Sequence, residues 1–159
     1  MCLLTLNVRG ICNSDKRKKV YMWCENQGAD VVFLQETHCT KQRVSKFTST
    51  WKGTSFHGIS DSPFSKGVSI LFKENIDVNV LDHLEYGEGR VLLLNLEMNG
   101  KGTTLVNIYA PNSVQNRCIF FENVQQWIAD SAKYLENVIM AGDFNCCLTD
   151  MDRNTKTHL

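Results

Sequence analysis

The chain has 159 residues, of which 43% are hydrophobic and 21% are charged. This composition favours one globular domain with a substantial core over a disordered protein. Seventeen basic residues balance seventeen acidic ones, so the charge gives no sign of the broad basic surface of a non-specific nucleic-acid binder. Any polyanionic partner must therefore be held by a local site.

The cysteine pattern indicates a reducing, intracellular environment. The seven cysteines are an odd number, lie in apolar segments and form no CxxC pair. We therefore expect reduced thiols packed as small hydrophobic side chains. The opening "MCLLTLNV" lacks the charged region of a signal peptide, and no apolar stretch is long enough to span a membrane. Neither secretion nor a membrane partner is expected.

The first part of the chain predicts a strand, a helix and a second strand. Residues 2–8 form a β-rich run that ends at "RG". Residues 14–28 have the apolar spacing of a helix, with Asn13 or Ser14 as its N-terminal cap. Residues 30–36, "DVVFLQE", then predict a buried strand. This β-α-β order favours parallel pairing of the two strands.

In the middle of the chain, strands follow one another through short connections. The predicted strands span residues 66–73, 76–85, 89–98 and 103–110. The "NGKG" between the last two predicts a hairpin turn, because Asn and Gly tolerate the positive φ that such turns need. The preceding segment, residues 57–67, is typical of an exposed loop.

The last part of the chain decides the expected fold class. Residues 111–136 place apolar side chains along one helical face, and residues 137–142 predict a final strand. Antiparallel pairs with helices between the outer strands fit an α+β sandwich better than a doubly wound Rossmann fold. We therefore expect two packed mixed β-sheets flanked by helices.

Polar side chains follow the apolar strands at the points where these strands end. They are Asn7, Glu36, Tyr109, Asn112, Asp143 and Asn145. If the strand ends share one edge of the sandwich, carboxylates, amides and a phenol meet on one concave rim. Such an oxygen-rich set suits a hard divalent cation such as Mg²⁺ and does not suit a soft metal.

Each of these residues also has an ordinary structural interpretation. An Asp or Asn after a strand commonly stabilises a turn, and Tyr109 alone is typical of a core residue with a satisfied hydroxyl. The four histidines show no metal-ligand spacing. The joint occurrence of all six polar residues at strand ends is what favours a site.

Four ordered motifs carry a resemblance to a known family. "LNVRGI", "FLQETH", "IYAPN" and "AGDFN" together resemble the endonuclease/exonuclease/phosphatase superfamily, which includes exonuclease III, apurinic/apyrimidinic endonucleases and DNase I. "QETH", "YAPN" and "GDFN" followed by "MDRNT" are most similar to the endonucleases of non-long-terminal-repeat retrotransposons of the long interspersed element type. The resemblance spans residues 1–159 as one domain and implies a DNase I-like fold.

The resemblance implies a catalytic metal centre. Glu36 would bind the catalytic Mg²⁺, with Mn²⁺ as an alternative, and Asn7 would help to orient that site. Asp143 would position or deprotonate the attacking water. Phosphodiester hydrolysis needs a polarised water and neutralised phosphate oxygens, so this assignment agrees with the chemistry of the residues. No small-molecule cofactor is expected.

The resemblance also implies a substrate side. Asn145 and Tyr109 would hold the scissile phosphate, and Asn112 would support the substrate. Arg9 departs from the repair enzymes of the family, in which a carboxylate at that position contributes to metal binding. Arg9 could meet a phosphate of the substrate or form a structural ion pair, and the sequence leaves both readings open.

The family pattern continues beyond "GDFN", with further strands and a terminal Asp-His pair. Here fourteen residues follow Asn145, and His158 does not stand in such a motif. We therefore expect a domain that is incomplete at its C-terminus and that cleaves poorly or not at all, because a positioned acid-base group contributes about 10²- to 10⁴-fold in rate. Apolar faces around Val91, Leu93 and Val106 are expected to be partly exposed.

Two classes of function follow from the resemblance. The first is a nuclear DNA endonuclease that nicks target DNA for retrotransposition and is fused in its parent protein to a reverse transcriptase. Exonuclease III-like or apurinic/apyrimidinic endonuclease activity in base excision repair is the sibling alternative. The second class is an inactive remnant that at most binds DNA.

Overall fold

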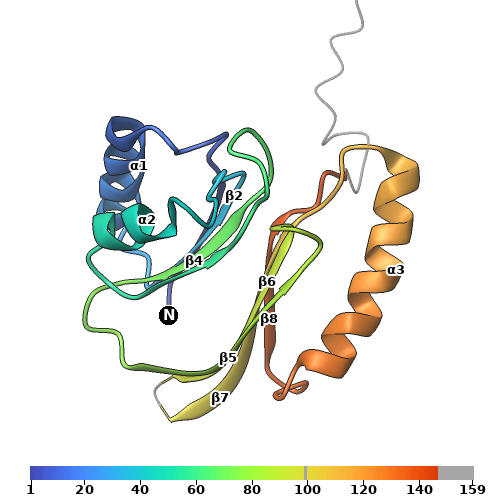
Figure 1. Ribbon diagram of the computed structural model, residues 1–159. Coiled ribbons are helices and arrows are strands. Elements are labelled where there is room, and N and C mark those ends of the chain that lie inside the picture. The colour runs from blue at the N-terminus through green and yellow to red at the C-terminus, as the bar shows by residue number, and fades with distance from the viewer. Residues whose placement is uncertain (99, 147–159) are drawn as a thin grey trace, which may run out of the picture.

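The computed structural model describes residues 1–98 and 100–146, and its centre is two β-sheets packed face to face (Figure 1). The first sheet has the order β1-β2-β4-β3. Its strands are β1 (Leu3–Asn7), β2 (Val31–Gln35), β3 (Ser55–Gly58) and β4 (Val68–Phe72). β1 and β2 pair in parallel, as the β-α-β order predicts, and the other pairs are antiparallel.

The second sheet has the order β5-β6-β7-β8. Its strands are β5 (Val78–Tyr86), β6 (Val91–Met98), β7 (Lys101–Tyr109) and β8 (Val138–Asp143). The predicted hairpin joins β6 and β7, and Gly100 in its turn has a φ of 73°. β8 pairs in parallel with β7. The predicted mixed sandwich is therefore confirmed.

Helices cover the outer faces of the two sheets (Figure 1). They are α1 (Ser14–Asn26), α2 (Val44–Thr50) and α3 (Val114–Ser131). The Asn13 side chain accepts hydrogen bonds from the backbone N–H groups of Asp15 and Lys16, both at 2.9 Å, so Asn13 is the cap of α1. Among residues 1–98 and 100–146, no helix has both the length and the apolar character needed to cross a membrane.

The layer between the sheets forms the largest part of the core. Phe33 and Ile70 of the first sheet and Leu92, Leu94 and Leu105 of the second are fully buried in one cluster. Burying an apolar side chain of this size stabilises the fold by about 1.5–3 kcal/mol. Because side chains alternate along a strand, this packing also fixes which residues stand at each strand end.

Two expectations from the sequence are wrong. The proposed loop over residues 57–67 begins too early, because His57 and Gly58 are buried in β3, where they pair with β4. Val91, Leu93 and Val106 are fully buried, not partly exposed, since α3 packs over this face of the second sheet.

Candidate active site

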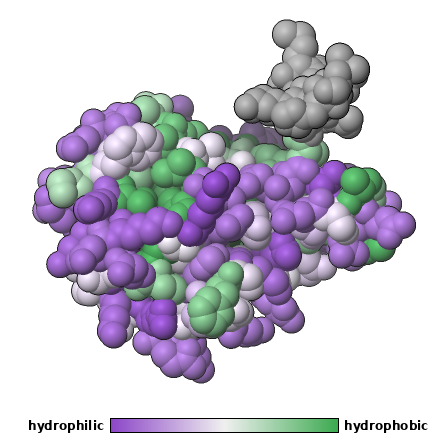
Figure 2. Space-filling model, turned by 90° about the horizontal axis from the view of Figure 1, so that it is seen from above, coloured by the Kyte–Doolittle hydropathy of each residue, from purple (hydrophilic) through white to green (hydrophobic). Residues whose placement is uncertain are grey.

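The C-terminal ends of four strands meet at one edge of the sandwich. The last residue pairs of the parallel strands are Asn7 with Gln35, and Tyr109 with Asp143. β1 and β8 also contact each other across the two sheets. Seen from above, the surface is largely hydrophilic, with hydrophobic side chains in separate patches (Figure 2). The strand ends thus bring the predicted polar residues together.

Asn7 joins two carboxylates into one centre. Its Nδ2 donates to Oε1 of Glu36 and to Oδ2 of Asp143, each at 2.9 Å, although Asn7 and Asp143 are 136 positions apart. Its Oδ1 accepts the backbone N–H of Arg9 at 3.1 Å, which fixes the orientation of the amide. Because one amide donates to both carboxylates, it offsets part of the repulsion between them.

The turn that presents Glu36 has an unusual backbone. Glu36, Arg9 and His38 have positive φ values of 52°, 46° and 59°. Such conformations cost about 1–3 kcal/mol each in residues other than Gly, and they persist where the surroundings hold them. Here the N–H of Gly10 donates to the Glu36 carbonyl at 2.6 Å, and the N–H of Thr37 donates to the Gly67 carbonyl at 2.9 Å.

The segment after β8 is held in a similar way. Oδ1 of Asp143 accepts the backbone N–H of Asn145 at 3.0 Å, and Nδ2 of Asn145 donates to the Ala110 carbonyl at 2.7 Å. Gly142 has a φ of 150°, and any side chain there would collide with the Ile108 carbonyl of β7. Glycine is thus required before the aspartate. A groove of about 590 Å³ runs along these residues and Asn7.

Tyr109 closes the centre on the side of β7. Burial, a hydrogen bond to the Glu36 carboxylate and the charge of that carboxylate raise the pKa of Tyr109 to about 12, against a smaller opposing effect of Arg90. The hydroxyl therefore keeps its proton at neutral pH and is a hydrogen-bond donor. Arg90 lies over the face of the ring, with its guanidinium carbon 5.3 Å from the ring centroid.

The side chains of two predicted residues, Asn112 and Arg9, do not take part in the contacts among Asn7, Glu36 and Asp143. Asn112 is exposed just before α3, where its carbonyl accepts a hydrogen bond from Arg117 at 3.0 Å. Arg9 is exposed next to the centre, and its side chain forms no ion pair within the part of the chain that the structure describes. The suggested structural ion pair of Arg9 is therefore not formed there.

Two buried amides support the site and were missed in the sequence. Nε2 of Gln35 donates to Oδ1 of Asn107 at 2.8 Å, and Nδ2 of Asn107 donates to the carbonyls of Leu34 and Ser69 at 2.9 and 2.8 Å. These bonds tie β2 to β7 directly below Glu36 and Tyr109. A polar residue inside an apolar strand, as in "FLQE" and "LVNIY", is the signal that could have identified them.

The donor set fits a hard divalent cation. Two carboxylates and neutral oxygens are the ligands that Mg²⁺ prefers, and Mg²⁺ commonly uses only one or two carboxylates and keeps several waters. Among the described residues, no cluster of three or more His, Cys, Asp or Glu side chains could hold a metal ion. A cation beside Glu36 and Asp143 would therefore leave coordination positions for water and substrate oxygens.

Comparison with known proteins agrees with this geometry. The profile of the Endonuclease/Exonuclease/phosphatase family matches residues 4–157. The chain belongs to this family. Its members are hydrolases that act on phosphodiesters or phosphate esters, generally with divalent metal ions. The family resemblance of the four motifs is thus confirmed.

One curated relative comes from a transposon. The chain is 32% identical over 154 residues to the uncharacterized 149 kDa protein of transposon TX1 from Xenopus laevis. The match covers 97% of this chain and 12% of that protein. The chain therefore corresponds to a small part of a much longer relative.

Solved structures show the same fold at low sequence identity. A conserved protein of unknown function from Enterococcus faecalis has a TM-score of 0.71 at 17% identity, covering 92% of this chain and 67% of its own. D. rerio TDP2 complexed with a single-strand DNA product has a TM-score of 0.63 at 22% identity, and the match covers 91% of this chain and 60% of that protein. A mannosyl-6-phosphatase from Bacteroides thetaiotaomicron has a TM-score of 0.68 at 14% identity, and the match covers 90% of this chain and 64% of that protein.

Proposed function

We propose that the protein is a Mg²⁺-dependent DNA endonuclease that nicks target DNA for a non-long-terminal-repeat retrotransposon. The observation that carries this proposal is the Asn7 bridge, which joins Glu36 and Asp143 at the edge where Tyr109 presents a protonated hydroxyl. The transposon origin of a relative at 32% identity supports the biological role. DNA as the partner, action in the nucleus and fusion to a reverse transcriptase in the longer protein belong to the same proposal.

The metal side of the reaction rests on Glu36. Its carboxylate, held by Asn7, would bind Mg²⁺, with Mn²⁺ as a substitute. When bound, the ion supplies positive charge to phosphate oxygens and makes a water molecule more acidic. Asn7 directs its NH₂ group, not its carbonyl oxygen, toward the carboxylates, so its role in this arrangement is to orient the ligand.

Asp143 is the residue best placed to act on water. Its two oxygens accept hydrogen bonds from Asn7 and from the backbone of Asn145, which fixes the plane of the carboxylate. In that position it would orient the attacking water and take its proton. Tyr109 would donate a hydrogen bond to a phosphate oxygen as negative charge develops there. Asn145 would hold the loop beside the phosphate through its bond to Ala110.

A plasmid-nicking assay tests the proposal. Supercoiled plasmid is incubated with an excess of protein, so that a slow single turnover is detected, and we expect open circles with Mg²⁺ and none with EDTA. Intact and abasic duplexes, and a 3′-recessed end, are compared in parallel. A strong preference for abasic sites would favour the repair alternative. DNA binding without any cleavage would favour the inactive remnant and overturn the endonuclease.

A further inference from the structure

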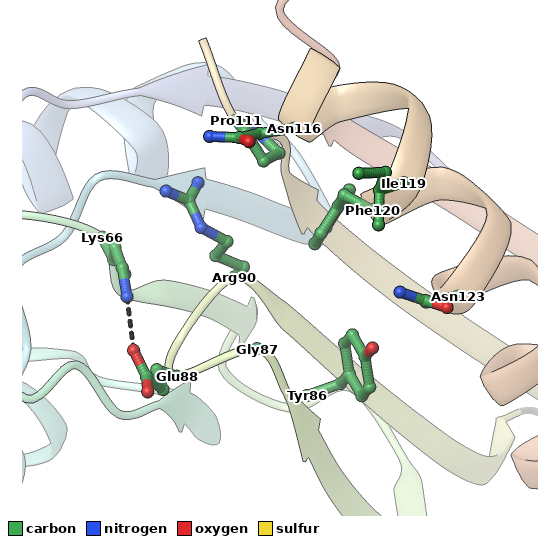
Figure 3. A pocket seen from close by; sticks show the side chains of 10 residues that line it. All are labelled: Lys66, Tyr86, Gly87, Glu88, Arg90, Pro111, Asn116, Ile119, Phe120 and Asn123. Atoms are coloured by element: carbon green, nitrogen blue, oxygen red, sulfur yellow. Dashed lines mark hydrogen bonds and ion pairs between the residues drawn. The ribbon is translucent and has the colours of Figure 1, made fainter. Parts of the chain in front are cut away.

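A second pocket lies beyond Arg90, between the turn that joins β5 to β6 and the first half of α3 (Figure 3). We call it the α3 pocket, and its volume is about 460 Å³. The lining residues that matter for its chemistry are Lys66, Glu88, Arg90, Asn116, Phe120 and Asn123. The sequence motifs at the strand ends do not include any of them.

Arg90 lines this pocket and also contacts Tyr109 of the candidate active site. Its guanidinium lies over the Tyr109 ring, and its Nη1 donates to the Tyr109 carbonyl at 3.1 Å. In Figure 3 its side chain extends from the strand toward Pro111 and Asn116. A ligand bound to Arg90 would therefore lie one aromatic ring away from the hydroxyl that faces Glu36.

The α3 pocket has an excess of positive charge, because its lining holds two cations, Lys66 and Arg90, and one acid, Glu88. Glu88, on the adjoining turn, pairs with Lys66 at 2.7 Å. Within the described residues, no carboxylate forms an ion pair with Arg90. An arginine guanidinium stays charged at neutral pH, and within residues 1–98 and 100–146 only one of the Arg90 donors bonds to a protein group. This half-buried cation favours an anion such as a phosphate.

The α3 side of the pocket offers different chemistry. Phe120, which is 9% exposed, borders the pocket with part of a largely buried aromatic ring, and Asn116 and Asn123 contribute exposed amides that form no side-chain hydrogen bond within the described part of the chain. Aromatic rings stack on nucleobases, and amides can pair with the donor and acceptor groups on base edges. A cation next to a ring and two amides matches a nucleotide better than a free phosphate.

We infer that the α3 pocket binds the nucleotide next to the cleaved phosphodiester, with its phosphate on Arg90 and its base against Phe120 and the two asparagine amides. The inference rests on the proposed endonuclease function and adds to it a determinant of the bases beside the cut. Arg90 contacts Tyr109, and this contact places the bound nucleotide next to the reacting phosphate and not at a distant point of the DNA strand.

The phosphate contact is tested without catalysis. Binding of a short fluorescent duplex is measured by anisotropy in EDTA at several salt concentrations. Arg90→Gln should reduce the slope of log K against log salt by about one, whereas Arg90→Lys and the surface control Lys73→Gln should keep it. An Arg90→Gln protein that melts like the wild type and binds with an unchanged slope would overturn the inference.

The base contact is tested by the positions of the nicks. Nicks made by the wild type and by Asn123→Leu are mapped by sequencing, and we expect the base preference at one position beside the cut to fall by about tenfold. Gln126→Leu is the matched control, since Gln126 is exposed on α3 and bonds to Asp130 of the same helix. Unchanged nick positions in Asn123→Leu would overturn base recognition. A wild type that never cuts would refute the proposed function, while the anisotropy assay would still decide the pocket.

Discussion

The carboxylates of Glu36 and Asp143 lie near the hydroxyl of Tyr109, and the Arg90 guanidinium lies over the face of the same ring. The carboxylates stand at strand ends and are joined by the Asn7 amide. Arg90 follows a turn and faces a helix, and within the described residues most of its donors bond to no protein group. In the proposed function, the carboxylates assigned to chemistry are thus fixed by bonds within the protein, whereas Arg90, assigned to binding, keeps donors for a ligand.

Left-handed backbone occurs in both regions. Glu36 and Asn145 are held in the left-handed region beside the carboxylates, by bonds that reach neighbouring segments. On the Arg90 side, Glu88 also has a positive φ of 55°, and its turn is held by the pairing of Tyr86 with Val91 and by the exposed Lys66–Glu88 ion pair. Because the carboxylates belong to the proposed metal centre and Arg90 lines the α3 pocket, substitutions on the carboxylate side should change the rate, and those on the Arg90 side should change affinity and base preference.

The largest effect is expected from Asp143→Asn. This substitution keeps the size of the side chain but removes the group that takes the proton from water, so the single-turnover cleavage rate should fall by about 10²- to 10⁴-fold. Asp77→Asn, at an exposed position before β5, should cleave like the wild type. Equal rates for the two variants would show that Asp143 is not the base.

The next effect is expected from Tyr109→Phe. The variant keeps the ring under Arg90 and removes only the hydroxyl, so it separates the role of the hydroxyl from that of the ring. Loss of one donor to the reacting phosphate should reduce the rate by about 10²- to 10³-fold, with little change in DNA affinity. Quenched-flow rates and anisotropy measure the two quantities. A loss of affinity at an unchanged rate would place Tyr109 on the binding side instead.

A smaller effect is expected from Asn7→Ala. Without the bridging amide, Glu36 is less well oriented and repels Asp143 more strongly, so the apparent Mg²⁺ affinity should fall by about 10- to 100-fold. High Mg²⁺ should restore most of the rate. Asn79→Ala, at an exposed position of β5, is the matched control. If Asn7→Ala required no more Mg²⁺ than this control, the bridge would have no role in metal binding.

The smallest effect at neutral pH concerns the free energy of unfolding and the buried residue His57, which lies outside the candidate active site. Burial, and to a lesser extent the charge of His83, lower the pKa of His57 to about 4. The unfolded chain binds a proton at this residue below about pH 6.5 and the folded chain only below about pH 4, so the free energy of unfolding should decrease as the pH falls through this window.

Urea unfolding at a series of pH values measures this effect. The loss should be on the order of 2–3 kcal/mol by pH 4 and should be much smaller in His57→Leu. An equal loss in the variant would mean that other groups cause it.

The sequence predicted those parts of the site that depend on where strands end. Asn7, Glu36 and Asp143 each stand at the end of an apolar run; parallel pairing brings together the ends of β1 and β2 and those of β7 and β8, and packing of the two sheets joins the two pairs. The helix α2 was not predicted, because "VSKFTST" is rich in β-branched and small polar residues that have weak helix propensity. It forms through packing of the fully buried Phe47.

Parts of the site that depend on distant segments could not be read from the sequence. The amides of Gln35 and Asn107 meet only after the two sheets pack together. Arg90 and Asn123 line the same pocket because α3 crosses the second sheet beside the β5–β6 turn, and no local pattern specifies that crossing. His158, whose role the family pattern leaves unassigned, lies outside the described residues.

Cleavage by Glu36→Gln at rising Mg²⁺ concentrations tests the central claim most directly, namely that Glu36 and Asp143 form one metal-dependent centre. The single-turnover rate on a labelled duplex is compared with the rates of the wild type and of Glu74→Gln, a control at an exposed position after β4. We predict Mg²⁺-dependent cleavage by the wild type and the control, and none by Glu36→Gln at any Mg²⁺ concentration. Cleavage by Glu36→Gln with the wild-type Mg²⁺ dependence would contradict the assignment.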